Sequence, residues 1–252
     1  MTRMRGIGMT VVICMCLWTV HAFAAGYDLP VSGKARVNYV QGSVVQVLDG
    51  TRKELAVRDI LAAPAAVVVG DNSRLELLVA DGSVLRFAPK TEFTLTSADA
   101  EPAVSRDIRV DVAMGDCWAK VQKLLGTQSS FEVNSPTAVA GVAGTVYRLR
   151  VESSAISKYY VYDGKVAVSY SPVSPPAGSG PVSQPVRVAG PSRVPGPHRV
   201  SVAQWMVVVS RGYRFTVFPT GRYLDPEPFD TQQDRTDPWV KWNLERDRTL
   251  DF

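Results

Sequence analysis

The sequence predicts an all-β fold, a compact solenoid-like or sandwich-like stack of short strands. A proline-rich linker and a small C-terminal piece with one or two short helices are expected to follow it. Between residues 31 and 170, apolar and polar residues alternate in short runs, as in half-buried strands. The runs recur at roughly 8–15 residues, without a helical stripe between them. Pairs typical of tight hairpin turns lie between runs: Asp49-Gly50, Asp81-Gly82 and Asp163-Gly164.

Residues 1–24 have the pattern of a secretory signal peptide. Arg3 and Arg5 precede an apolar run from Ile7 to Val20, and Ala22-Phe23-Ala24 is a small-x-small cleavage site. We therefore expect cleavage after Ala24 and a periplasmic or secreted protein without a spanning helix. An uncleaved membrane anchor is the alternative, but the apolar run is shorter than the ~20 residues that cross a bilayer.

Residues 31–170 are predicted to form the β domain. The clearest inward-facing positions are Leu75, Leu77 and Val79, then Leu85 and Phe87, then Phe93 and Leu95, then Ile108, Val110 and Val112, and finally Val166 and Val168. Cys117 is the one cysteine after the predicted signal peptide, so apolar burial and not a disulfide must hold this domain together. Within its strand, a buried and inert thiol is favoured over a nucleophile.

A small-residue segment, Ser135–Gly144, precedes one of these strands. Its proline and glycines disfavour a helix, and it is too apolar for an ordinary exposed loop. We expect a tight, buried crossing in which Gly141 and Gly144 let one chain segment lie close to another. Thr145 and Tyr147 then begin an alternating strand. These four residues are candidate structural or binding residues.

The segment Ser135-Pro136-Thr137-Ala138-Val139-Ala140-Gly141-Val142-Ala143-Gly144-Thr145-Val146-Tyr147-Arg148-Leu149 resembles the hallmark of the FecR-type periplasmic domain. Further matching segments follow the FecR order: Val37–Val44, Val69–Leu77, Asp81–Phe87 and Tyr162–Val168. The resemblance implies a stack of short strands in a periplasmic setting. It does not imply iron binding, and we expect this chain to lack the anti-sigma segment of the FecR regulators.

Residues 171–198 differ sharply in composition, with eight of the 17 prolines and no acidic residue. Such a segment buries too little apolar surface to offset its ordering entropy, so it is interpreted as an extended linker. Residues 199–252 form the small C-terminal segment. For residues 200–210 the spacing of apolar residues favours a helix, with a strand over Met206–Val209 as the alternative.

A second short helix is predicted from Asp237 to Arg248, with Asp237 as N-cap and Pro238 in the first turn. Trp239 and Trp242 lie three residues apart on this otherwise charged segment. Leaving two indoles in water would create an adhesive patch. We therefore expect this helix to dock on the β domain through them.

The sequence contains none of the residue patterns that are typical of catalytic or cofactor-binding sites. His198, the one histidine after the signal peptide, lies among prolines, and the spacings of zinc, phosphate-loop and serine-hydrolase motifs are absent. Asp107 and Asp111 share a strand face with Arg109, which favours a solvated salt-bridge ladder over a catalytic carboxylate pair. No enzyme activity, cofactor or metal is predicted.

The favoured function is therefore a non-enzymatic interaction or scaffold protein of the cell envelope, with an envelope protein as partner and envelope signalling as its setting. A cell-wall or glycan-binding module is the alternative, and an enzyme with a carboxylate site ranks last. Without a Lys/Arg run, nucleic acid is not expected as a partner. The candidate surface aromatics are Trp118, Tyr147, Tyr159, Tyr160 and Tyr162. Tyr160 and Tyr162 share one strand face, which is either exposed or packed.

Overall fold

A computed structural model of the chain describes residues 29–101, 104–123, 129–170 and 206–249. The strands are β1 (Lys34–Gln41), β2 (Val44–Leu48), β3 (Thr51–Glu54), β4 (Ile60–Ala62), β5 (Ala65–Val69), β6 (Arg74–Val79), β7 (Val84–Phe87), β8 (Glu92–Glu101), β9 (Ser105–Lys120), β10 (Ser129–Asn134), β11 (Ala138–Val142), β12 (Val146–Val151), β13 (Ser157–Asp163), β14 (Lys165–Tyr170), β15 (Met206–Ser210), β16 (Tyr213–Val217) and β17 (Tyr223–Pro228). Two helices follow, α1 (Thr231–Asp234) and α2 (Pro238–Thr249). The predicted signal peptide and the predicted linker lie outside the described residues.

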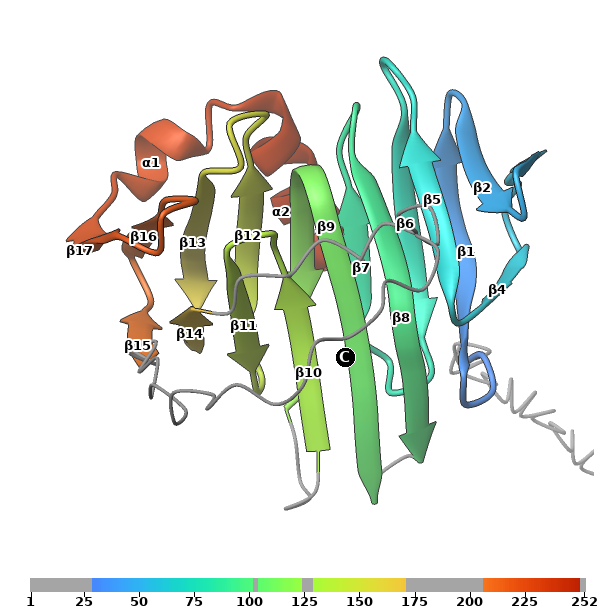
Figure 1. The fold of residues 1–252 in the computed structure, drawn as a ribbon, viewed down its shortest axis with the longest axis horizontal. Helices are drawn as coiled ribbons and strands as arrows, with labels where there is room; N and C mark the ends of the chain where they lie inside the picture. Colours follow the sequence, from blue (N-terminus) through green and yellow to red (C-terminus); the bar gives the residue numbers. More distant parts are fainter. Residues whose placement is uncertain (1–28, 102–103, 124–128, 171–205, 250–252) are drawn as a thin grey trace, which may run out of the picture.

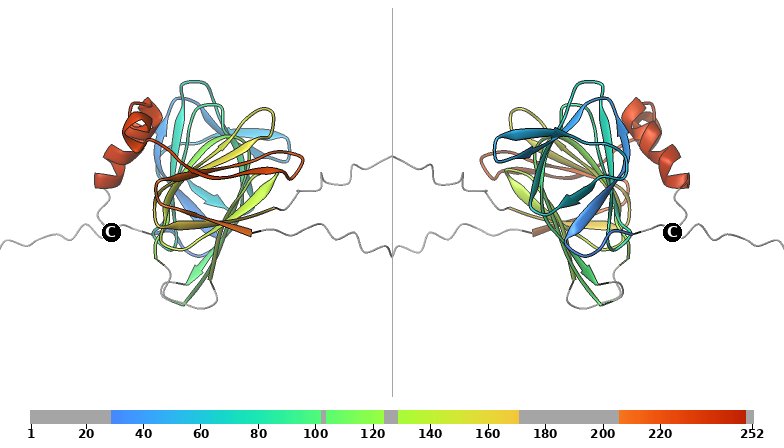
Figure 2. Two further views of the ribbon diagram at one scale, coloured as in Figure 1. Left: turned by 90° about the vertical axis from the view of Figure 1, so that its left-hand side faces the viewer. Right: turned by 90° about the vertical axis from the view of Figure 1, so that its right-hand side faces the viewer.

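Hydrogen bonds join all these strands into one mixed sheet, which folds over itself into two layers (Figure 2). Layer A has the order β4-β1-β6-β7-β9-β12-β13-β16-β17. Layer B has the order β3-β2-β5-β8-β9-β10-β11-β14-β15. The long strand β9 belongs to both layers, and its pairing with β10 is parallel. The predicted all-β class is confirmed.

The bend in β9 lies at Gly115, the residue at which pairing changes from layer B to layer A. Its φ is +103°, and a Cβ there would lie 2.6 Å from the Cα of Thr91. Only glycine fits both requirements.

The chain advances along both layers together, from β1 and β2 at one end to β15–β17 at the other (Figure 1). Short runs of strands alternate between the layers, so the path resembles a solenoid while the two layers pack as a sandwich. The predicted hairpin turns lie within this path. Asp49 and Gly50 have φ of 46° and 78° between β2 and β3, and Gly164 has φ of 77° between β13 and β14.

The core lies between the layers and includes all the predicted inward-facing residues. Phe87 of layer A and Phe93 of layer B stack at 3.6 Å between ring centroids. Cys117 is buried in the same core, as predicted, and burial raises the pKa of its thiol well above the usual range. A protonated, inaccessible thiol is not a nucleophile.

The prediction of a helix over residues 200–210 is wrong for the residues that the structure describes, because Met206–Ser210 form strand β15. Three consecutive valines favour a strand, and Val209 pairs with Val166 of β14 in layer B. Strand β16 pairs with β13 in layer A. The C-terminal segment therefore extends both layers of the β domain. The predicted domain boundaries, and independent folding of residues 31–170, stay predictions.

The small-residue segment forms a strand and a turn, so the expected crossing is only partly correct. Ala138 and Ala140 of β11 point into the core. Gly141 is not a close approach, since the nearest atom to an added Cβ would be 3.9 Å away. Gly144 does lie close to another segment: its φ is +67°, and an added Cβ would lie 3.1 Å from the Cα of Lys123.

The predicted C-terminal helix and its docking are present as α2, which lies against the outer face of layer A (Figure 2). A carboxylate oxygen of Asp237 accepts the backbone N–H of Trp239 at 2.8 Å, and its carbonyl accepts that of Lys241 at 2.9 Å. Asp237 is therefore the N-cap and Pro238 the first helical residue, as the sequence predicts.

Candidate functional site

The outer face of layer A carries charged and aromatic side chains beneath α1 and α2. Because side chains alternate along a strand, residues beside the core positions point outward. Glu76 of β6, Arg86 of β7 and Trp118 of β9 lie on this face, and each is 0 % exposed. Arg148 of β12 is 1 % exposed and Tyr160 of β13 is 9 % exposed. We call this surface the helix-covered face.

An ion cluster holds α2 to this face. The Arg86 guanidinium donates to a Glu76 carboxylate oxygen at 2.6 Å and to Asp247 of α2 at 2.6 Å. Arg246 of α2 donates to both Glu76 oxygens, at 2.5 and 2.9 Å. Asn38 donates to Glu76 as well. Each charged residue of the sheet is therefore paired with an opposite charge on the helix: Glu76 with Arg246, and Arg86 with Asp247.

The environment of Glu76 pushes its pKa in two directions. Burial favours the neutral acid and raises the pKa, whereas the hydrogen bonds from Arg246, Arg86 and Asn38 and the charge of Arg86 lower it. The lowering effects together exceed the effect of burial, so the pKa lies below its usual value. Glu76 is therefore an ionised anchor and not a proton donor.

A second group of charges surrounds Arg148. Its guanidinium donates to Asp116 of β9 at 2.9 Å and lies 3.5 Å from Asp237 and 3.7 Å from Asp234. Burial lowers the pKa of Arg148, but Asp116 foremost, followed by Tyr162 and Asp234, raises it above the usual value. The Tyr162 hydroxyl donates to Asp234, and burial followed by this contact raises the tyrosine pKa. Both groups keep their protons.

The aromatic side chains fill the space between these charges. The Trp118 ring lies 4.5 Å from that of Tyr162, and Trp239 stacks on Trp242 at 5.3 Å. Trp118, Trp239 and Val240 form a separate apolar cluster, with Trp242 packed at its edge. Of the two alternatives for the faces of β13, packing on both faces is therefore the one that the structure has. The cause is the C-terminal segment, which covers this face.

Tyr147 and Thr145 have structural positions. Tyr147 is 0 % exposed on the inner face of layer A, and burial raises its pKa well above the usual value. The Thr145 hydroxyl donates to the backbone carbonyl of Lys165 at 2.9 Å, next to the Gly144 turn. Neither side chain reaches the helix-covered face. The structure thus brings together Tyr160, Tyr162, Trp239 and Trp242, but not Gly141, Gly144, Thr145 and Tyr147.

An open groove adjoins the helix-covered face where α1, α2 and the β13–β14 turn meet. It consists of two pockets, about 520 and 420 Å³ in volume. Both pockets share Arg235, Leu244 and Asp247, so they adjoin each other. Tyr162 and Val146 are the other apolar or aromatic residues of the second pocket. The remaining charged side chains of the two pockets are Lys241, Glu245, Arg248, Asp163 and Arg211.

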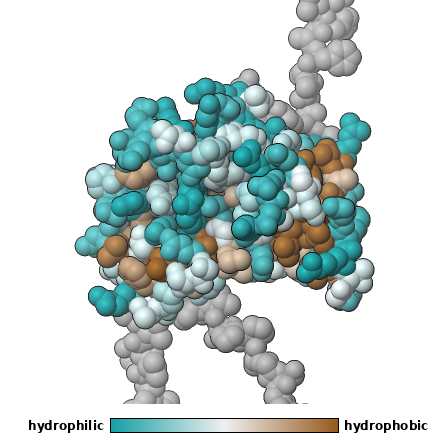
Figure 3. All heavy atoms as spheres, turned by 90° about the horizontal axis from the view of Figure 1, so that it is seen from above, coloured by the Kyte–Doolittle hydropathy of each residue, from teal (hydrophilic) through white to brown (hydrophobic). Residues whose placement is uncertain are grey.

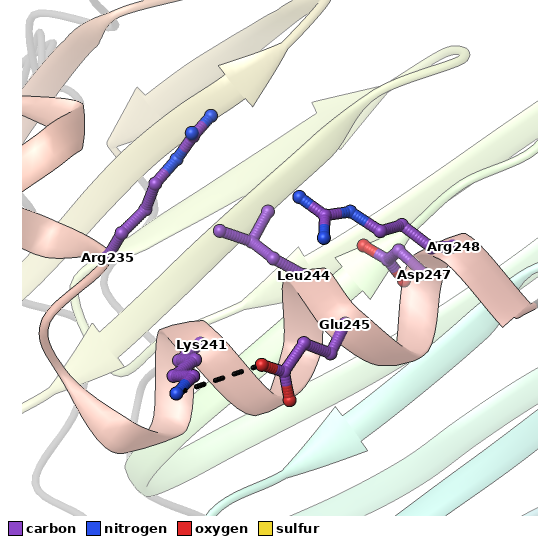
Figure 4. A pocket seen from close by; sticks show the side chains of 6 residues that line it. All are labelled: Arg235, Lys241, Leu244, Glu245, Asp247 and Arg248. Carbon is purple, nitrogen blue, oxygen red and sulfur yellow. Dashed lines mark ion pairs between the residues drawn. The ribbon is translucent and has the colours of Figure 1, made fainter.

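Most charged side chains of the groove are paired with one another or with the sheet. Lys241 lies 3.9 Å from Glu245, and Arg211 lies 3.9 Å from Asp163. The Asp247 carboxylate is engaged by Arg86 and by the Trp118 indole N–H. Within the described part of the chain, the guanidinium groups of Arg235 and Arg248 have no carboxylate partner. Figure 4 shows these two side chains on either side of Leu244.

Two other pockets of similar volume lie on the described surface, about 550 Å³ beside Tyr160, Arg214 and Asp237 and about 450 Å³ beside Phe131, Gly141 and Val208. The face seen from above in Figure 3 is mostly hydrophilic, with hydrophobic residues in separate patches. The predicted ladder is present: Arg109 lies 3.5 Å from Asp107 and 3.1 Å from Glu132, while Asp111 accepts from Thr96 and Asn134. Among the described residues, no three His, Cys, Asp or Glu side chains could hold a metal ion.

The ion cluster was not predicted from the sequence, although one of its two causes is visible there. The turn at Asp81-Gly82 sets the register of β6 and β7, and this register places Glu76 opposite Arg86. Opposite charges on facing strands are a recognised stabilising pair. Their burial could not be predicted, because it depends on Arg246 and Asp247, some 160 residues further along the chain.

The fold and this site define a β-sandwich module with a C-terminal helix docked on one layer and a cation-lined groove beside it. The family model described as "FecR protein" matches residues 65–167. The chain contains a FecR domain, as its sequence predicted. No curated protein matches the chain.

Two crystal structures of a "putative anti-sigma factor" from Parabacteroides distasonis are similar to this chain, both at 15% identity. The matches cover 69% and 67% of this chain, with TM-scores of 0.46 and 0.45. The chain spans 64% and 62% of the length of those chains, less than two thirds. Within the described ranges, no helix is long and apolar enough to cross a membrane.

Proposed function

We propose that this protein is an exported, non-enzymatic interaction module that binds a protein partner in the cell envelope. The observation that carries the proposal is the groove between α1 and α2, where Arg235 and Arg248 border apolar side chains and have no carboxylate partner among the described residues. Apolar contact area and charges free to pair across an interface are what a protein partner requires. Export to the periplasm rests on the signal-peptide pattern of residues 1–24.

Several observations support binding over catalysis. The shifted pKa values belong to groups that are paired or deeply buried, such as Glu76, Arg148 and Cys117. Their shifts keep each group in one protonation state at neutral pH, whereas a general acid or base needs a pKa near the working pH. Of the two carboxylates of the predicted ladder, Asp107 is paired with Arg109, and Asp111 accepts hydrogen bonds from Thr96 and Asn134.

Protein binding is favoured over glycan binding because the neighbouring tyrosines on which a sugar ring would stack are packed. Tyr160 and Tyr162 meet Phe229 edge-on, at 5.4 and 5.6 Å between ring centroids. They are therefore not free to form a stacking platform.

Site-specific photo-crosslinking in the native envelope tests the proposal. A photoreactive residue at Lys241, in the groove, should give discrete protein adducts. The same residue at Arg52, exposed on β3, should give none. Equal labelling from both sites, or co-sedimentation with purified peptidoglycan without protein adducts, would contradict it. Intact-mass analysis of the envelope protein checks export, because the mass should correspond to a chain that begins at Ala25.

A further inference from the structure

The groove presents two cations around one apolar side chain, and they come from different elements. Leu244 and Arg248 are four residues apart on α2, so they lie on the same side of the helix. Arg235 is the C-cap of α1, and its backbone N–H donates to the carbonyl of Thr231. In Figure 4 the Arg235 and Arg248 side chains extend on the same side of α2 as Leu244. Lys241 and Glu245 pair with each other.

The position of this group is fixed by the contacts beneath it. Asp247, the neighbour of Arg248, bonds to Arg86 at 2.6 Å and to the Trp118 indole at 3.1 Å. Tyr162, which lines the groove, is held by its hydroxyl bond to Asp234. A rigid backing of this kind reduces the ordering entropy that a ligand must overcome.

We propose that the groove binds an acidic linear peptide in which an apolar side chain lies between two carboxylates. This inference rests on the proposed function and names the chemistry of the partner. Guanidinium groups bind carboxylates through paired, charge-assisted hydrogen bonds, and Arg235 and Arg248 have none within the described residues. The apolar side chain of the peptide packs on Leu244 and Tyr162.

A small free anion fits this groove less well than a peptide. The combined pockets are far larger than one anion, and an anion would leave Leu244, Val146 and Tyr162 uncovered. The acidic groups of the groove do not block the peptide, because Asp163 faces Arg211, Glu245 faces Lys241 and Asp247 is committed to Arg86.

Selection from a random peptide display library on the full mature protein tests this inference. Enriched peptides should carry two acidic residues around a Leu, Phe or Trp, and a synthetic peptide made from them should bind more weakly as salt increases. The double variant Arg235→Gln/Arg248→Gln should weaken binding about tenfold or more and flatten the salt dependence. The matched control is Arg52→Gln/Arg222→Gln, which removes two exposed arginines elsewhere and should leave the affinity unchanged.

The outcomes separate this inference from the proposed function. Peptides without acidic residues, no enrichment at all, or equal binding by both double variants would overturn the inference. Envelope adducts at position 241 that persist in Arg235→Gln/Arg248→Gln would leave the proposed function in place while rejecting the acidic ligand. Thermal unfolding of each variant confirms that any loss of binding does not come from unfolding.

Discussion

Replacing Arg86 by methionine is expected to lower the melting temperature of the protein by about 6–20 °C. Arg86 is 0 % exposed and joins Glu76, itself 0 % exposed, to Asp247 at 2.6 Å on each side. Methionine removes the charge and all donors but fills a similar volume. Glu76 then remains buried with Arg246 and Asn38 as its partners.

The magnitude follows from the cost of breaking a buried ion pair. Removing one partner of such a pair costs about 3–5 kcal/mol, because the other charge stays in a poorly solvating environment. For a domain of 150–250 residues, 1 kcal/mol corresponds to roughly 2–4 °C in melting temperature. Multiplying the two ranges gives the expected shift. Differential scanning calorimetry on the mature protein measures it.

Two further variants make this reasoning refutable. Arg52→Met changes the same residue type on the exposed strand β3 and should shift the melting temperature by less than about 2 °C. Glu76→Leu combined with Arg86→Met removes both buried charges and should be less destabilising than Arg86→Met alone. If Arg86→Met behaves like Arg52→Met, or if the double variant is the least stable, the ion cluster does not anchor α2 as described.

Three other predictions concern single residues. Gly144→Val should destabilise the protein by about 1–3 kcal/mol in urea unfolding, since φ is +67° and Lys123 leaves no space. Gly141→Ala should be mild, and an equal loss at both glycines would contradict the argument. Because the folded pKa of Glu76 is depressed, its stabilisation is complete above the unfolded value of about 4.3 and is lost as pH falls through the folded pKa. Glu76→Gln should flatten the acid limb of a pH–stability curve, and an unchanged limb would exclude this role. In a chain that begins at residue 25, the buried Cys117 thiol should react with a thiol reagent only after unfolding, so labelling of the native protein would contradict its burial.

The all-β class, the hairpin turns and the core positions could be predicted because their causes are local. Alternation along Arg74–Val79 determines which side chains face inward, whatever the strand pairs with. Asp49-Gly50 accommodates positive φ at consecutive residues, so the turn is specified by two residues. The cap of α2 is equally local, with Asp237 accepting from Trp239.

Local patterns failed where burial depends on distant parts of the chain. Glu76, Arg86 and Arg148 occupy outward positions that alternation assigns to solvent, yet α1 and α2 bury them. Met206–Ser210 matched helical and strand spacing alike, and pairing with β14 decided for the strand. A cross-strand or helix–sheet partner changes the free energy of such a segment by more than its intrinsic propensity does.

The amino-acid sequence by itself determined the FecR resemblance, the strand alternation, the turns and the capped helix, since each depends on residues a few positions apart. The tertiary structure decided the two-layer arrangement, the place of β15 at the end of layer B and of β16 and β17 at the end of layer A, and the groove around Leu244. These features join segments up to about 170 residues apart, such as Glu76 and Arg246. Contacts of that range arise only when the folded chain brings complementary charges and apolar surfaces together, and no local pattern records which ones will meet.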